Sequence, residues 1–248
     1  MRIGASLGPE PEEIVETPEE FDFIELAIGE KEISPEEIDD EKVKKDLEEG
    51  DFGLVVHLPF RQPAATKIEA LNQGLLNYFD ELLEFSADLG AEKAVIHANA
   101  REEDDEDNID VLEEMIHRLN DLGNSHGVEI CMENVGQWDG IELFELGEIL
   151  EHTNVSMCFD TGHAFAEVGQ EETEVFLEEF SHVISHLHVQ DTREGRDLHL
   201  CIGEGEIEWS PLGDYLKDFA GTACLEVFTS DSDYQLMSRD KFLESLEP

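Results

Sequence analysis

The sequence has few basic residues. It contains 15 lysine and arginine residues against 63 aspartate and glutamate residues, so its formal net charge is −48 over 248 residues. Nucleic-acid binding usually depends on a basic face, so this balance argues against a nucleic-acid partner, although molar salt screens that attraction for every protein. The repulsion among carboxylates destabilises a compact chain in dilute salt, whereas molar salt shortens the screening length to about 3 Å. We therefore expect a salt-loving source with a salt-filled cytoplasm.

Cysteine is scarce, and long apolar runs are missing. The four cysteines, Cys131, Cys158, Cys201 and Cys224, form no CxxC pair, and three of them lie in predicted core strands. This pattern favours small buried side chains in a reducing compartment over zinc or disulfide roles. No apolar run of about 18 residues and no signal-peptide pattern occurs, so we expect a cytoplasmic protein without membrane contact.

Several common catalytic and cofactor motifs are also missing. The sequence contains no GxSxG segment, so serine hydrolase chemistry has no support. It contains neither GxGxxG nor GxxxxGK[ST], and a nucleotide cofactor is therefore not indicated.

Short apolar runs alternate with amphipathic stretches along the whole chain. Predicted strands cover residues 2–7, 21–26, 54–57, 93–97, 128–133, 155–160, 183–188 and 222–226. Predicted helices lie near residue 9 and over residues 34–49, 66–89, 109–122, 141–152, 172–181, 211–219 and 234–246, the second of them opened by a capping box at Ser34. This alternation predicts an α/β fold, a single-domain (β/α)8 TIM barrel over residues 1–248, with a doubly wound open sheet as the alternative.

Most of the predicted strands end in a carboxylate or an imidazole. These polar ends are His57, His97, Glu133, Asp160, His188 and Glu226. Catalytic groups of such barrels sit at the carboxyl ends of the strands, so we expect these side chains to meet at one mouth. A single strand-end aspartate such as Asp160 is more often the cap of the following helix than a ligand. The repetition over six strands favours a site.

Two glutamates, an aspartate and a histidine that face one another need a cation. We predict Glu133, Asp160, His188 and Glu226 as metal ligands. Three carboxylates and one imidazole suit Mn²⁺, Co²⁺ or Mg²⁺ better than Zn²⁺. Each neighbouring polar residue is by itself more typical of a structural role, but together they leave a second or third ion open. These possible additional ligands are His57, His97, His163, His186, Asp197 and His199.

Four segments resemble the xylose isomerase-like barrel superfamily, which includes sugar and sugar-phosphate isomerases and epimerases and the endonuclease IV family. The segments are Glu133-Asn134, Asp160-Thr-Gly-His163, His186-Leu-His188 and the loop from His199 to Trp209. The resemblance covers nearly the whole chain. It implies an enzyme with a divalent metal ion and a barrel fold.

Similarity to the ketose 3-epimerase-like branch implies an isomerase or epimerase that acts on a sugar or sugar phosphate. In that branch the four predicted ligands hold one ion, and Glu133 and Glu226 are also the catalytic proton-transfer pair. A metal that bridges a carbonyl and the neighbouring hydroxyl acidifies the C–H bond between them and stabilises a cis-enediolate. The substrate-binding residues expected from this resemblance are His57, His97, His163, Arg193 and His199.

The endonuclease IV branch is the alternative, with a trinuclear zinc site that cleaves DNA at abasic positions. The four predicted metal ligands and the possible additional ligands named above are compatible with the ligand pattern of that branch. The segments Ala98-Asn-Ala100 and Val135-Gly-Gln-Trp138 depart from that branch, and loops rich in Arg, Tyr and Leu that would enter DNA are not evident. A non-enzymatic barrel and a homo-oligomer are further open alternatives. Trp138 and Trp209 could form a platform under a sugar ring, or Trp209 could pack its loop.

Overall fold

Eight parallel strands close into a barrel in the computed structural model, which describes residues 1–29, 35–100, 106–136, 140–229 and 231–247. The order around the barrel is β1-β10-β7-β6-β5-β4-β3-β2, so β1 pairs with both β2 and β10. The strands are β1 Arg2–Ser6, β2 Phe23–Ala27, β3 Gly53–His57, β4 Lys93–His97, β5 Glu129–Glu133, β6 Ser156–Asp160, β7 Ile184–Val189 and β10 Thr222–Leu225. The predicted (β/α)8 barrel is confirmed, and the open sheet is wrong.

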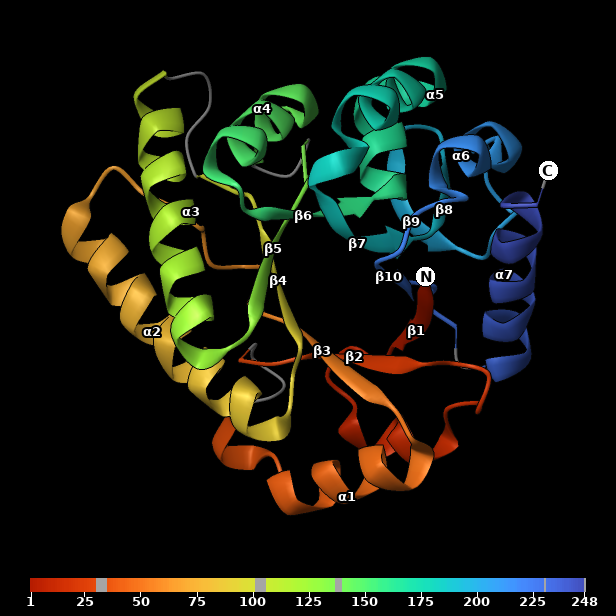
Figure 1. Cartoon of the computed structure of the whole chain (residues 1–248), viewed down its shortest axis with the longest axis horizontal. Coiled ribbons are helices and arrows are strands. Elements are labelled where there is room, and N and C mark those ends of the chain that lie inside the picture. Colours follow the sequence, from red (N-terminus) through yellow and green to blue (C-terminus); the bar gives the residue numbers. More distant parts are fainter. Residues whose placement is uncertain (30–34, 101–105, 137–139, 230, 248) are drawn as a thin grey trace.

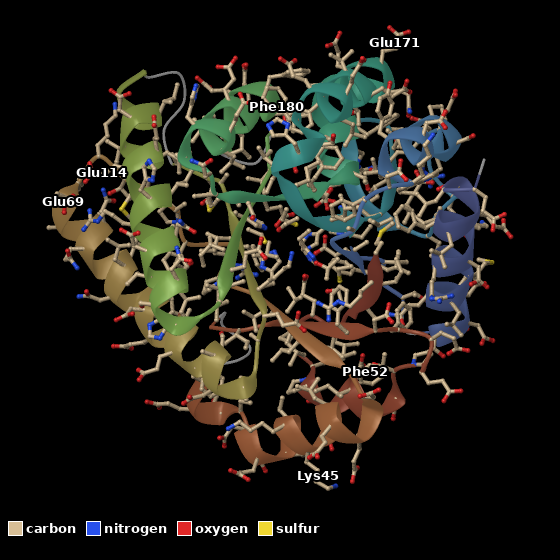
Figure 2. The ribbon with its side chains drawn as sticks, in the orientation of Figure 1. Lys45, Phe52, Glu69, Glu114, Glu171 and Phe180 are labelled. Atoms are coloured by element: carbon tan, nitrogen blue, oxygen red, sulfur yellow. The ribbon has the colours of Figure 1, made fainter. Side chains whose placement is uncertain are left out.

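Helices surround the barrel on its outer side (Figure 1). They are α1 Asp40–Gly50, α2 Glu69–Leu89, α3 Glu106–His126, α4 Leu143–Thr153, α5 Thr161–Phe180, α6 Trp209–Leu216 and α7 Ser232–Ser245, with short 3-10 helices at Pro11–Glu16, Pro35–Glu37 and Ser181–Val183. Figure 2 shows Lys45, Glu69, Glu114 and Glu171 on the outer faces of this helical ring. Within the described ranges, every helix is too short or too polar to cross a membrane.

Alternate residues of six strands, β2 to β6 and β10, belong to two separate cores. On β3, Leu54 and Val56 join the large core with the helices, whereas Val55 belongs to a second cluster. That second cluster comprises Phe23, Val55, Val95, Cys131, Cys158 and Cys224. Because side chains of a strand alternate between its two faces, this second cluster fills the interior of the barrel. Three of the four free cysteines are therefore interior packing residues, as predicted.

Two predicted helix starts are wrong. Ser34, the expected cap, lies outside the described residues, and α1 begins only at Asp40, after the 3-10 turn Pro35–Glu37. The side chain of Asp39 caps α1 by accepting a hydrogen bond from the backbone N–H of Lys42. The helix expected from residue 172 instead begins at Thr161, directly after β6, and Gly169 interrupts it with a φ of 78°.

A hairpin that the apolar pattern of the sequence does not predict follows β7. It consists of β8 Asp191–Arg193 and β9 Arg196–Leu200, which pair antiparallel. Its turn residues Glu194 and Gly195 have φ values of 58° and 60°, as a two-residue turn between antiparallel strands requires. The hairpin extends the carboxyl end of β7 and carries two polar side chains, Asp197 and His199, toward the mouth of the barrel.

Candidate active site

The polar layer at the mouth lies one step above the apolar filling of the barrel. Each of its side chains stands two residues after an interior residue of the same strand, so both point inward. The pairs are Phe23 and Glu25, Val55 and His57, Val95 and His97, Cys131 and Glu133, Cys158 and Asp160, His186 and His188, and Cys224 and Glu226. The barrel interior thus changes from apolar to polar within two residues along six strands, whereas on β7 both residues are histidines.

Glu133, Asp160, His188 and Glu226, here called the central cluster, meet at the middle of this layer. One ligand atom from each lies within 4.8 Å of the others. Nδ1 of His188 lies 3.2 Å from Oε1 of Glu133, 3.4 Å from Oε2 of Glu226 and 3.9 Å from Oδ2 of Asp160. The four side chains predicted as metal ligands are therefore brought together.

The charges of the central cluster are strongly coupled. The pKa of Glu226 is raised to about 7, mainly by burial and also by the carboxylates of Glu133 and Asp160, against the lowering effect of His188 and His199. Burial also opposes ionisation of Glu133, but His97, His188 and His163 hold its pKa well below the ordinary value. The pKa of His188 lies well above its ordinary value, because neighbouring acidic groups outweigh its burial.

A second group surrounds the other oxygen of Glu133. Nε2 of His57 and Nε2 of His97 both lie 3.1 Å from Oε2 of Glu133. Nδ1 of His57 is 2.9 Å from the carbonyl oxygen of Leu58, which can accept a hydrogen bond from a protonated Nδ1. Glu133 therefore faces the central cluster with one oxygen and two imidazoles with the other.

A third group lies at the hairpin. Nε2 of His199 lies 3.1 Å from Oδ1 of Asp197, and Nε2 of His163 lies 3.5 Å from Oδ2 of the same carboxylate. Although burial opposes protonation, the hydrogen bond to Asp197 raises the pKa of His199 to about 9. The hairpin thus supplies a carboxylate between two imidazoles.

Gln190 ties this third group to the central cluster. Its side-chain amide donates to Oδ2 of Asp160 at 3.1 Å and to Oδ1 of Asp197 at 3.2 Å. Its amide oxygen accepts from the backbone N–H of His199 at 2.8 Å. Gln190 is fully buried and was not among the predicted residues. A glutamine directly after a strand of alternating histidines gave no separate signal.

A cavity of about 370 Å³ opens over these groups. It is lined by the polar side chains of Glu25, His57, His97, Glu133, His163, Asp197, His199 and Glu226, with Ser6, Gly8, Pro9, Ala27, Phe60 and Phe228 completing the wall. The ring of Phe228 stacks on that of His199 with centroids 4.0 Å apart. One side of the opening is therefore aromatic, whereas its floor is acidic.

Three predicted residues lie away from this cavity or below its surface. Arg193 is exposed on the hairpin and is not among the lining residues. His186 is fully buried beneath the polar layer, where it contacts Glu25 and Thr222. Trp209 packs edge-on against Phe242 and donates to Asp191, so the platform interpretation is wrong for this residue. Trp138 lies outside the described residues.

Glu25 is a buried acidic residue of the site that is absent from the set of residues predicted from the sequence. It is 1% exposed, lies on β2 and lines the cavity. A signal was present, because a glutamate two residues after Phe23 repeats the spacing between Val55 and His57. The prediction covered polar residues at the ends of strands, whereas β2 continues past Glu25 to Ala27.

The donor set of the central cluster suits a divalent cation. Oε2 of Glu226 is buried without a hydrogen bond, and three carboxylates surround one imidazole. Such crowding of buried carboxylates is costly unless a cation compensates it. An oxygen-rich set with one imidazole is typical of Mn²⁺, Mg²⁺ or Co²⁺. The residues present therefore fit a metal ion of this class.

Sequence comparison identifies relatives along most of the chain. The family described as xylose isomerase-like TIM barrel matches residues 18–247. The uncharacterized protein MJ1311 of Methanocaldococcus jannaschii is 25% identical over 210 residues, which cover 78% of this chain and 70% of that protein. The uncharacterized protein MJ1614 of the same organism is 27% identical over 163 residues, covering 64% of this chain and 63% of that protein.

Solved structures with the same fold include several named as sugar epimerases. A D-tagatose 3-epimerase-like protein has a TM-score of 0.79 at 21% identity, with 99% of this chain and 97% of that one covered. D-allulose 3-epimerase from Methylomonas sp. has a TM-score of 0.81 at 16% identity, covering 100% and 97%. The 3-keto-D-glucoside 4-epimerase YcjR from E. coli has a TM-score of 0.75 at 16% identity, covering 97% and 99%. At these identities the likeness establishes the fold.

Proposed function

Because this chain belongs to the xylose isomerase-like TIM barrel family, we propose that it is a metal-dependent isomerase or epimerase of a sugar or sugar phosphate. The observation that carries this proposal is the central cluster, whose four ligand atoms lie within 4.8 Å of one another. This cluster adjoins a cavity of about 370 Å³, a size typical of small-molecule sites. The names of the structural neighbours, which are sugar epimerases, give further support.

The two glutamates of the central cluster would act as the proton-transfer pair in this proposal. Glu133 ends β5 and Glu226 follows β10, and the barrel places β6 and β7 between these strands. A divalent ion held by the cluster would acidify the C–H bond beside a carbonyl group. One glutamate removes that proton, and the other delivers a proton from its own side. Return to the same carbon inverts it, whereas delivery to the neighbouring carbon moves the carbonyl.

The remaining lining residues would orient the substrate. His163 and His199 present ring nitrogens near the cavity, where they can hydrogen-bond hydroxyl or carbonyl oxygens. Phe60 and Phe228 offer apolar surface to the C–H face of a sugar. A sugar would therefore offer oxygens to the imidazoles and C–H groups to the phenyl rings.

A second candidate function rests on the two groups beside the central cluster. His57 and His97 share an oxygen of Glu133, and His163 and His199 share Asp197. Each group could hold a further cation, which would give the three-metal arrangement of the endonuclease IV branch and phosphodiester hydrolysis at abasic DNA. The described residues lining the cavity include four carboxylates and no lysine or arginine. That lining favours the sugar over a polyanionic duplex.

Metal content separates the two candidates. The protein is purified in concentrated KCl without added metal or chelator, and its metals are counted by mass spectrometry. We expect close to one manganese, cobalt or magnesium ion per chain, together with exchange of solvent deuterium into a ketose or ketose phosphate. Two or three zinc ions with cleavage of an abasic duplex in concentrated KCl would replace this proposal by the second candidate.

A Glu133→Gln variant tests whether the barrel is an enzyme at all. Loss of a proton-transfer group and metal ligand should lower turnover by at least about 100-fold. Glu171→Gln, an exposed change of the same kind on α5, serves as the control and should leave turnover unchanged. If Glu133→Gln supports the biological role as well as the wild-type chain, the barrel is a non-enzymatic module.

A further inference from the structure

Glu25 is a buried carboxylate to which the proposed reaction gives no role. Nε2 of His188 hydrogen-bonds Oε2 of Glu25 at 3.2 Å, and it lies 3.1 Å from Oε1, which is buried without a hydrogen-bond partner among the described residues. Nε2 of His186 lies 3.0 Å from Oε2 of the same carboxylate. Two imidazoles of one strand, β7, therefore converge on a single side chain of β2.

The hydrogen bonds fix which nitrogen of His186 carries a proton. Nδ1 of His186 lies 2.7 Å from Oγ1 of Thr222, closer than the 3.4 Å that separates this hydroxyl from the carbonyl oxygen of Ser185. Nε2 of His186 faces the carboxylate of Glu25, which only accepts hydrogen bonds, so the proton of the neutral ring is on Nε2 and the hydroxyl of Thr222 can donate to Nδ1. This N–H donates to Glu25.

Glu25 also determines which nitrogen of His188 keeps a proton when the other binds a cation. An ionised carboxylate only accepts hydrogen bonds, so Nε2 of His188 must carry a proton to face Glu25 at 3.1 Å. Nδ1 faces the carboxylates of the central cluster, with Oε1 of Glu133 at 3.2 Å, so a cation bound there would replace a proton on Nδ1 and leave the remaining proton on Nε2.

We infer that Glu25 is a positioning residue that holds His188 with Nε2 protonated and Nδ1 directed at a divalent metal ion in the central cluster. The inference rests on the metal site of the proposed function and not on its substrate. Oε2 of Glu25 accepts the N–H groups of both His186 and His188, so this carboxylate orients two histidines of β7 at once. A carboxylate that accepts the second N–H of a ligating histidine also strengthens that histidine as a ligand.

A Glu25→Gln variant tests this role through metal affinity. An amide oxygen in the place of Oε2 can accept from both imidazoles, but the NH₂ group in the place of Oε1 then opposes the N–H of His188. Titration of chelator-treated protein with Mn²⁺ and with Zn²⁺ in concentrated KCl, followed by calorimetry, should show affinity reduced by roughly 10- to 100-fold. Glu129→Gln is the matched control, because Glu129 begins β5 and contacts Lys93 at the opposite end of the barrel. Its metal affinity should equal that of the wild-type chain.

A second measurement uses the wild-type chain, so it does not depend on how the variant folds. Nitrogen NMR of Zn²⁺-loaded protein with labelled histidine should show His188 bound through Nδ1 and protonated at Nε2. Binding through Nε2, or a folded Glu25→Gln variant with wild-type affinity, overturns the inference while the proposed reaction stands. Weakened metal binding in this variant without sugar turnover in the wild type overturns only the reaction. A wild-type chain that binds neither ion overturns both.

Discussion

Oε2 of Glu226 lies 3.4 Å from Nδ1 of His188 without a hydrogen bond to it, although both atoms are in the barrel interior. The side chains come from β7 and from the residue that follows β10, two neighbouring strands of the barrel. Their pKa values move upward together, for Glu226 through burial first and for His188 through its acidic neighbours. Removing the charge of Glu226 therefore affects both partners.

Replacing Glu226 by glutamine should abolish most of the activity. The variant loses one proton-transfer group and one carboxylate ligand, so turnover should fall by about 100- to 10,000-fold, and metal affinity should fall with it. Deuterium exchange into the substrate and calorimetric metal titration measure the two effects. Glu171→Gln should match the wild type in both. Retention of turnover in Glu226→Gln would remove this residue from the reaction.

The stability of the metal-free protein should depend on pH through His199. Its folded pKa is about 9 against an ordinary value of 6.5. A raised histidine pKa contributes stability that is fully present below the unfolded pKa and is lost as pH rises through the folded pKa. Urea unfolding of chelator-treated protein should therefore show His199 contributing progressively less between about pH 6.5 and pH 9.

The variant Asp197→Asn isolates this contribution. It removes the carboxylate that raises the pKa of His199, so the loss of unfolding free energy between about pH 6.5 and pH 9 should be smaller than in the wild type. The exposed pair of His182 and Glu151 supplies the control, because Glu151→Gln should leave the pH dependence unchanged. An equal pH dependence in Asp197→Asn and the wild type would contradict the assignment.

Alanine at Gly162 should disturb the site without touching a predicted ligand. A Cβ atom there would lie 2.6 Å from Cδ of Gln190, whose amide holds Asp160. We expect a loss of about 1–3 kcal/mol in unfolding free energy and weaker metal binding. Gly74, in the middle of α2, has open space around it, so Gly74→Ala should instead stabilise the chain by up to about 1 kcal/mol. Equal effects of the two changes would show that Gln190 yields without consequence.

Truncation of Phe228 should weaken substrate binding more than it slows the reaction. This side chain is 67% exposed at the opening and stacks on His199. A proposed apolar contact with the sugar would be the same in the ground and transition states, so Phe228→Ala should raise KM by about three- to tenfold with little change in kcat. Val175→Ala, at an exposed apolar position on α5, should change neither constant. A fall in kcat alone would give Phe228 a part in the chemical step.

Helix cap and metal ligand, the two alternative interpretations of Asp160, are compatible with each other. Oδ1 accepts from the backbone N–H of His163 at 2.6 Å, while Oδ2 faces His188 at 3.9 Å. A carboxylate has two oxygens, so one can cap α5 and the other can serve the central cluster. The strand ends were predictable because the strands alternate strictly between two faces.

The hairpin after β7 could not be predicted from apolar alternation. Its strands are short and carry mostly polar side chains, so no periodic pattern marks them. The turn at Glu194 and Gly195 was a weak signal, because glycine there accepts a positive φ. Asp197 and His199, which were predicted as possible additional ligands, line the cavity, and their role remains a prediction.

Pairing of β1 with β10 joins the two ends of a segment that runs from Arg2 to Leu225. Long-range pairing of this kind is slow to form, and during synthesis Glu226 leaves the ribosome after the other three residues of the central cluster. The complete cluster cannot exist before that moment. Binding of a metal ion to all four residues would therefore be a late event in the assembly of the molecule, and would mark the chains in which the barrel has closed.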